Sequence, residues 1–340
     1  MKRARSSRRR AFRLPESATG WLVEEGIAEH RAMRLEGEDI VVARVEWPGQ
    51  LAAGWIVDAR LISRAVGSAR GTALAENGEE VLVDRLPKET SEGARLRLVI
   101  TRAALHGPGR FKRAQARPSE AAPSQPSLAE RLGARIVRRF PVEGWDALID
   151  EALAGEIAFA GGALLFAPTP AITTVDVDGR MPPRGLALAA IPELSRALRR
   201  FDLGGSVAVD FPTPEAKADR RAIDDALAAA LATWPHERTA INGFGLVQIV
   251  SRLERASLIH LAGWQRAGLV WRRLLRRAEV LEGAGPIELS LHPSLERAIG
   301  ADHLAELERR TGASVRVRKV ATLAPDAPHA QRVAPENRDD

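Results

Sequence analysis

The segment Ile172-Thr-Thr-Val-Asp-Val-Asp-Gly-Arg180 decides the fold that we expect for the centre of this chain, and Val207-Ala-Val-Asp-Phe211 completes it. Side chains alternate between the two faces of a strand. The first segment therefore predicts that its valines enter a core while Asp176 and Asp178 project together from the other face. Asp210 ends the second run of small and β-branched residues. If the two strands are neighbours, three carboxylates meet at one strand end.

These aspartates are the candidate functional site. Carboxylates held side by side repel one another, and a bound divalent cation removes that cost. Hard oxygen ligands of this kind suit Mg²⁺, with Mn²⁺ as the alternative, rather than zinc. Such a cation lowers the pKa of a bound water and neutralises charge during phosphodiester hydrolysis. Aspartates at turns and strand ends also serve as caps or surface charges, which is the structural alternative.

Length and composition narrow the class of protein. The 340 residues predict two or three domains with a substantial core. The chain has no cysteine, which excludes disulfides, thiolate zinc sites and a cysteine nucleophile. The basic N-terminus lacks the apolar centre of a signal peptide, and the sequence contains no run of about 18 apolar residues. We therefore expect a soluble cytoplasmic protein without a membrane span.

The positive charge is concentrated in two segments. Residues 1–13 contain seven Lys or Arg and no acid, which leaves 43 of the 50 basic residues against 44 acidic residues in the rest of the chain. Residues 110–117 add four basic residues, again without an acid. Two basic segments on a chain that is otherwise nearly neutral favour contact with the phosphate backbone of a nucleic acid. An incidental disordered extension is the alternative, because a chain with 45 Arg and five Lys is typical of a GC-rich genome.

Periodic patterns divide the chain into domains. Short alternating runs such as Ile40–Val45 and Ile56–Leu61 predict a small β-rich, OB-like unit, whose tryptophans are expected mainly in its core. From Ser127 onward, strands alternate with helices, which predicts a central α/β catalytic domain. A smaller β-α-β unit is predicted at the C-terminal end, and the fold class predicted for the whole chain is α+β. The predicted boundaries are a basic disordered tail over 1–18, the β-rich candidate RNA-binding unit over 19–105, a linker over 106–126, the metal-dependent catalytic domain over 127–262, the small C-terminal domain over 263–325 and a disordered tail over 326–340.

A helix is predicted over 263–281, with leucines on one side and arginines on the other. Its basic face predicts either phosphate binding or an ordinary solvated helix surface. The arginines concerned are Arg266, Arg272, Arg273, Arg276 and Arg277.

Several motifs, taken in order, resemble the catalytic region of the ribonuclease E/G family. The first is Gly161-Gly162 before a strand, followed by Thr173-Thr-Val-Asp-Val-Asp-Gly-Arg180. The second is Arg200-Phe-Asp-Leu-Gly-Gly205, which leads into the strand that ends at Asp210, and the third is Phe244-Gly-Leu-Val-Gln-Ile249. The likeness covers about residues 127–258 and, more faintly, the C-terminal unit.

The resemblance implies a Mg²⁺-dependent endoribonuclease that cuts single-stranded RNA and leaves 5′-phosphate and 3′-hydroxyl ends. Asp176 and Asp210 match the family's metal-binding aspartates. Asp178 stands where the family has an asparagine that orients the metal-bound water or an aspartate. Arg180 stands where a basic residue of the family meets a phosphate of the RNA.

The chain also departs from this family. The family's Cys-Pro-x-Cys zinc link is absent around Ser257–Leu261, so no zinc is expected, and the segment for an RNA 5′-monophosphate is missing. These departures predict a short, divergent member and leave two alternatives open. One is an RNA-binding relative that has lost efficient cleavage. The other is a phosphatase, because Asp176-Val-Asp-Gly179 also resembles the nucleophile loop of haloacid-dehalogenase-like enzymes, although only Lys217 and Lys319 follow as the lysine which that family needs.

Overall fold

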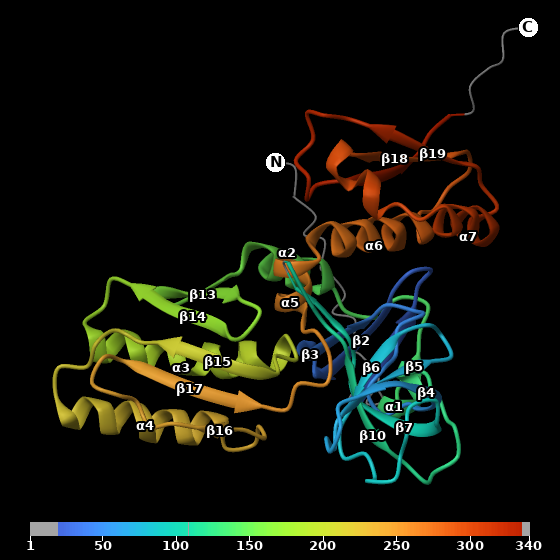
Figure 1. Cartoon of the computed structure of the whole chain (residues 1–340). Helices are drawn as coiled ribbons and strands as arrows, with labels where there is room; N and C mark the ends of the chain where they lie inside the picture. The colour runs from blue at the N-terminus through green and yellow to red at the C-terminus, as the bar shows by residue number, and fades with distance from the viewer. Residues whose placement is uncertain (1–19, 108, 335–340) are drawn as a thin grey trace, which may run out of the picture.

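The protein is described by a computed structural model that covers residues 20–107 and 109–334 (Figure 1). It combines helices with several sheets and one small closed barrel, which confirms the α+β class. The basic tail predicted over 1–18 lies outside the described residues.

The first strands of the chain belong to the main core. Leu22, Met33 and Val45 share one buried cluster with the central helices and strands. The short helix α1 (Leu128–Leu132) follows a capping box in which Ser127 and Glu130 satisfy each other's backbone N–H groups. The four strands of this N-terminal sheet, in the order β11-β1-β2-β3, are β1 (Gly20–Glu25), β2 (His30–Glu36), β3 (Asp39–Glu46) and β11 (Arg135–Ile136).

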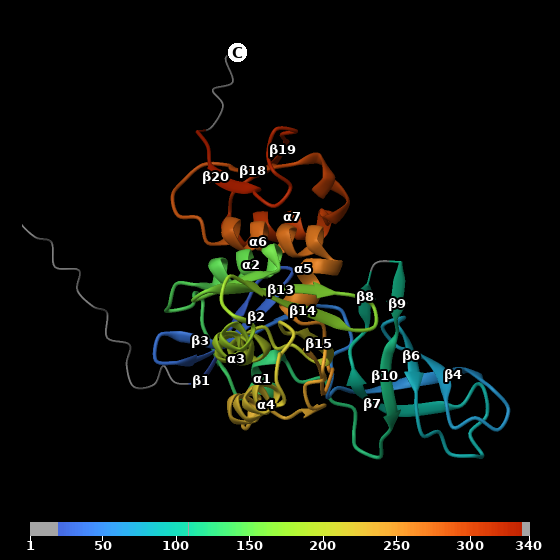
Figure 2. The same cartoon turned by 90° about the vertical axis from the view of Figure 1, so that its left-hand side faces the viewer.

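A closed five-stranded barrel follows and has its own core, which includes Leu61, Val81 and Leu98. It projects from the side of the molecule in Figure 2. The single β-rich unit predicted over 19–105 is therefore two separate units. The barrel strands, in the order β10-β6-β5-β4-β7, are β4 (Ile56–Arg64), β5 (Gly71–Ala75), β6 (Glu80–Val83), β7 (Arg95–Arg102) and β10 (Ala114–Pro118).

The linker predicted over 106–126 is wrong for most of its length. A hairpin of β8 (Leu105–Gly107) and β9 (Arg110–Lys112) opens it, and β10 then closes the barrel by pairing with both β6 and β7. The alternation in β10 rests on buried alanines, Ala114 and Ala116, which are too small to give a clear strand signal among Pro and Gly residues.

The chain enters and leaves the barrel at one place. Ile56 and Ser124 exchange two backbone hydrogen bonds of 2.8 and 2.9 Å, and the Trp55 Nε1 donates to the Pro126 carbonyl oxygen at 2.9 Å. The barrel is therefore an insertion between β3 and α1.

A six-stranded sheet forms the central domain. Its β14 and β15 are parallel and are connected by the long helix α3 (Pro183–Arg200), which begins with proline at its first position, where no hydrogen bond is lost. Helix α4 (Lys217–Leu231) packs beside α3. The strands, in the order β12-β13-β14-β15-β17-β16, are β12 (Glu156–Phe159), β13 (Gly162–Pro168), β14 (Thr173–Gly179), β15 (Gly205–Asp210), β16 (Glu237–Arg238) and β17 (Leu246–Ser251).

The C-terminal unit has the predicted β-α-β form: β18 (Ile287–Leu291) and β19 (Val315–Lys319) are parallel, with α7 (Ala301–Thr311) between them. Figure 1 shows this sheet above α6 and α7. A third strand, β20 (His329–Arg332), pairs antiparallel with β18, so the disordered tail predicted from residue 326 is wrong over these four residues. The remaining helices are α2 (Trp145–Ala154), α5 (Leu258–Trp264), α6 (Arg266–Glu279) and the 3₁₀ helix η2 (Pro293–Ala298).

Three arginines of α6, Arg272, Arg273 and Arg276, are neither solvated nor free for phosphate. Arg276 is buried and its Nε lies 3.0 Å from a carboxylate oxygen of Glu24 in β1. Arg273 lies 2.8 Å from Asp146 of α2, and the Arg272 guanidinium stacks 3.8 Å above the Trp47 ring. Neither predicted role fits, because these side chains join α6 to the N-terminal sheet and α2.

Within the described residues, no helix has both the length and the apolar character needed to cross a membrane.

A buried histidine holds the start of α5. The Ser257 hydroxyl accepts the His260 backbone N–H at 3.1 Å, and His260 Nδ1 accepts the Ser257 backbone N–H at 3.2 Å. His260 Nε2 lies 3.2 Å from the Thr173 hydroxyl at the beginning of β14. Because Nδ1 is an acceptor here, these bonds require the neutral ring. Burial, helped by the positive charge of Lys112, lowers the pKa of His260 to about 4.

We predict that acid weakens the fold through His260. The unfolded chain takes up this proton near pH 6.5 and the folded chain only near pH 4, so the free energy of unfolding falls as the pH drops between these values. The loss from this one residue is about 3 kcal/mol. Urea denaturation of the wild type and of His260→Gln from pH 7.5 to pH 4 measures it. The difference between the two proteins should shrink as the pH falls; a constant difference would contradict the assignment.

Candidate functional site

The aspartates lie on one face of the central sheet. In β14 the valines are buried and the residues between them are exposed, as the sequence predicts. The same alternation holds in β15 and β17. The exposed positions of these three strands therefore share one face, opposite the buried face: Thr174, Asp176, Asp178, Asp210, Leu246, Gln248 and Val250.

Strand register brings Asp176 and Asp210 together. They are direct partners in the parallel pair β14–β15, where neighbouring backbones lie about 4.8 Å apart. Asp178 is on the same face but lies two residues beyond, opposite Ala163 and past the end of β15. Leu165 and Leu246 are the next partners on either side, so the carboxylate pair sits between two apolar side chains.

The carboxylates of Asp176, Asp178 and Asp210 make no ion pair or hydrogen bond with any side chain or backbone group in the described part of the chain. Arg180 is exposed immediately after β14, and only its backbone N–H is bonded, at 3.3 Å to the Gly161 carbonyl oxygen. The two neighbouring carboxylates thus have no cationic partner in the described residues, and the guanidinium of Arg180, two residues after Asp178, stays available to a ligand.

The donor set fits an open site for a hard cation. In residues 20–107 and 109–334, no group of three or more His, Cys, Asp or Glu side chains is arranged to enclose a metal ion. Mg²⁺ does not need such a cage, since it commonly uses one or two carboxylates, keeps several waters and takes its other ligands from substrate phosphates. Asp176 and Asp210 match that description, whereas Asp178 is placed to act beside them.

Two glycines allow the strand that carries this pair to pack closely. Gly162 and Gly179 are partners in the antiparallel pair β13–β14, and both face Leu186 of α3. A Cβ on Gly179 would overlap the Gly161 carbonyl oxygen, and one on Gly162 would overlap the Asp178 carbonyl oxygen. The Gly161-Gly162 and Asp178-Gly179 motifs are therefore explained by steric fit at the end of β14.

We predict that Gly179→Ala destabilises the protein by about 1–3 kcal/mol, because the added methyl group meets backbone that cannot rotate away. Gly243→Ala is the matched control, since a Cβ there meets nothing within 4 Å. Urea denaturation measures both. Equal stability of the two variants would show that the strand end can adjust, contrary to this reading.

The turn at residues 242–245 lies beside the pair; the sequence placed Phe244 in the Phe-Gly-Leu motif but assigned it no role in the site. Phe244 is 81% exposed, and Leu246, two residues later, is the strand partner of Asp210. The signal was present in the sequence as an aromatic residue inside Asn242-Gly-Phe-Gly245, a run of turn-forming residues.

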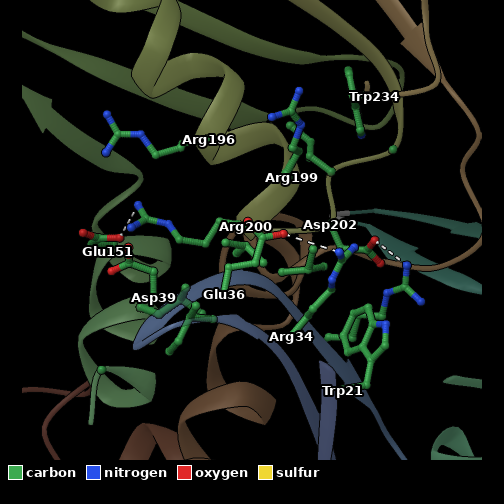
Figure 3. A pocket seen from close by; sticks show the side chains of 18 of the residues that line it. Trp21, Arg34, Glu36, Asp39, Glu151, Arg196, Arg199, Arg200, Asp202 and Trp234 are labelled. Carbon is green, nitrogen blue, oxygen red and sulfur yellow. Dashed lines mark hydrogen bonds and ion pairs between the residues drawn. The ribbon is translucent and has the colours of Figure 1, made fainter. Parts of the chain in front are cut away.

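A large cavity lies elsewhere. It measures about 1230 Å³ and is bounded by β2, β3, α2 and the C-terminal end of α3 (Figure 3). Its described lining carries seven arginines and seven acidic residues. Most of these charges pair with one another, as Arg200 and Glu151 do at 2.7 Å. The cavity therefore offers a ligand little uncompensated charge, and it lies at the end of α3 remote from the aspartates.

Asp202 is the centre of this ionic network. Its two carboxylate oxygens lie 3.1 Å from Arg44 of β3 and 2.7 Å from Arg255, which follows β17 (Asp202 is labelled in Figure 3). Burial lowers the pKa of Arg44. Burial also acts to lower the pKa of Arg255, but the negative charges of Asp202 and Glu254 outweigh it, so the pKa of Arg255 is raised. One carboxylate therefore joins the N-terminal sheet, α3 and the segment after β17.

We predict that Asp202→Asn lowers the free energy of unfolding by about 2–4 kcal/mol, because two partly buried guanidinium groups lose their counter-charge. Asparagine keeps the shape and tolerates the positive φ of 50° found here. Glu36→Gln serves as control, because its ion pair with Arg34 is exposed and should contribute less than about 1 kcal/mol. Urea denaturation measures both variants. If Asp202→Asn lowers the free energy of unfolding no more than Glu36→Gln does, Asp202 does not hold these segments together.

No protein-family model matches the chain, and no curated protein matches it significantly.

Proposed function

We propose that this protein is a Mg²⁺-dependent endoribonuclease that hydrolyses phosphodiester bonds of single-stranded RNA. The observation that carries the proposal is the strand register that sets Asp176 opposite Asp210, both exposed on one sheet face without a cationic partner in the described chain. The motifs that resemble the ribonuclease E/G family support it, because they are the segments that build this strand end.

Each residue of the strand end has a role in this proposal. Asp176 and Asp210 would hold the cation, which when bound would supply a water of lowered pKa and neutralise charge on the phosphodiester. Asp178, two residues along the same face, accepts a hydrogen bond from the attacking water and orients it. The water oxygen bonds to phosphorus and gives up one proton, the bond from phosphorus to the 3′ oxygen breaks, and that oxygen takes up a proton, which leaves a 5′-phosphate and a 3′-hydroxyl end. Arg180 binds a phosphate of the RNA.

The barrel supports RNA binding in a different way. Its five strands, with β10 parallel to β6, resemble the OB-like folds that bind single strands. The adjoining β8–β9 hairpin carries Phe111, which is 51% exposed and whose ring centroid lies 4.7 Å from that of His106, next to Lys112 in the same strand. In contrast, Trp47 is buried and does not supply a binding face.

This hairpin lies near the start of β14. Strand β8 contacts α5, whose His260 bonds Thr173 at the first residue of β14. Figure 2 shows the hairpin extending from the barrel toward the central sheet. This contact reaches β14 through the buried Thr173, on the face opposite the aspartates, so the hairpin is a separate candidate contact for RNA at the edge of the central sheet.

We predict that the purified protein cleaves a labelled single-stranded RNA when Mg²⁺ is present. Asp176→Asn and Asp210→Asn should each lower the rate about 100-fold or more, because a lost carboxylate ligand removes several kcal/mol of charge stabilisation. Asp225→Asn is the control, since Asp225 is an exposed α4 residue with only a long ion pair of 3.9 Å to Arg221. Equal rates in the wild type and the two site variants would remove the assigned site.

A second candidate is an RNA-binding protein without efficient cleavage. The described chain offers two adjacent carboxylates and not a closed set of three ligands, and this favours that alternative. Salt-dependent RNA binding without Mg²⁺-dependent turnover would identify it.

A further inference from the structure

We propose that Phe244 and Leu246 form a nucleobase subsite beside Asp176 and Asp210, which holds one unstacked base of the RNA next to the bond that is cut. This inference rests on the proposed function, and it adds the reason for a single-stranded substrate. It begins with the exposure of Phe244, the most exposed of the described phenylalanines at 81% of its surface.

The turn that carries Phe244 is fixed by its own hydrogen bonds. The Asn242 Oδ1 accepts the backbone N–H of Phe244 at 2.9 Å and that of Leu246 at 3.0 Å. The Asn242 carbonyl oxygen accepts the Gly245 N–H at 3.2 Å. An asparagine that caps a turn in this way presents the aromatic ring from a defined backbone conformation.

The same turn is tied to the residue after the catalytic-site aspartate. Phe211 donates its backbone N–H to the Gly245 carbonyl oxygen at 3.1 Å, and Thr213 lies 3.5 Å from the Phe244 carbonyl oxygen. Gly245 has a φ of 94°, and a Cβ there would overlap the Phe211 carbonyl oxygen. Only glycine fits, so the position of the turn relative to Asp210 is set by packing as well as by hydrogen bonds.

The surface beside the turn suits a base. Leu246, the strand partner of Asp210, is 41% exposed, and Val250 on the same face is 42% exposed. Gln248 lies between them on this face and carries both a donor and acceptors for a base edge. An aromatic ring and aliphatic side chains next to a phosphate-binding site form a stacking platform, which accepts any base with a free face.

This arrangement selects RNA that is not paired. A base inside a duplex has both faces covered by its neighbours, whereas a base in a loop or a free strand can turn onto a protein ring. Because the turn is already ordered, little conformational entropy is lost when the base binds.

The test compares binding of a labelled 12-nucleotide single strand and of the matching duplex by fluorescence anisotropy, without divalent metal so that no cleavage occurs. Phe244→Ala should weaken single-strand binding about 5- to 100-fold and leave duplex binding unchanged, and Phe244→Trp should restore it. Ile136→Ala is the control, because Ile136 is 57% exposed on β11, outside the sheet that carries the aspartates. Urea denaturation checks that Phe244→Ala is folded.

A second measurement locates the base. In a series of strands with one abasic nucleotide moved along the chain, the effect of Phe244→Ala should vanish at one position only, the position whose base touches the ring. An effect of equal size at every position would overturn a subsite for one base.

The outcomes separate this inference from the proposed function. Unchanged affinity of Phe244→Ala, in a protein that cleaves RNA with Mg²⁺, overturns the subsite and leaves the nuclease. Phe244-dependent binding in a protein that never cleaves supports the subsite and overturns the nuclease. If Phe244→Ala instead converts a dimer into a monomer in sedimentation, with RNA affinity unchanged, the ring belongs to a contact between copies and the subsite is wrong.

Discussion

The parallel pairing of β14 with β15 is the constraint on which the rest of the central domain depends. Its valines need a cover on one face, and the long crossover helix α3 provides it because parallel strands cannot be joined by a tight turn. The register that buries Val175 beside Val209 also sets Asp176 beside Asp210. A slip of one residue would move the carboxylates into the core, so hydrophobic burial itself fixes the position of the charged pair.

The sequence predicted this part of the fold well because the alternation in both strands is strong and local. The aspartate face, α3 and the C-terminal β-α-β unit all follow from such patterns. The barrel boundary did not, since β10 buries only alanines, which give a weak strand signal. Phe244 was placed in a motif but given no role for a related reason: its exposed position is set by a turn that packs against Phe211, and no periodic pattern predicts a contact of that kind.

Ionic contacts between distant segments were beyond sequence reasoning. Arg276 meets Glu24, and Asp202 meets Arg44, across 252 and 158 positions of chain. In a chain with 50 basic and 44 acidic residues, nothing in the order of the residues says which charges will be buried together. The arginines of α6 illustrate the point, because the same side chains suit a phosphate, the solvent or a neighbouring helix until the tertiary contacts are known.

The inserted barrel has a consequence for how this protein is assembled. The two chain segments that enter and leave the barrel are hydrogen-bonded to each other at Ile56 and Ser124. The barrel core is separate from the core that β1–β3 share with the central domain. A short loop in its place would span the same gap without breaking the main core. The barrel can thus be removed or exchanged as a unit without cutting through the main core, which makes it a separate element for redesign.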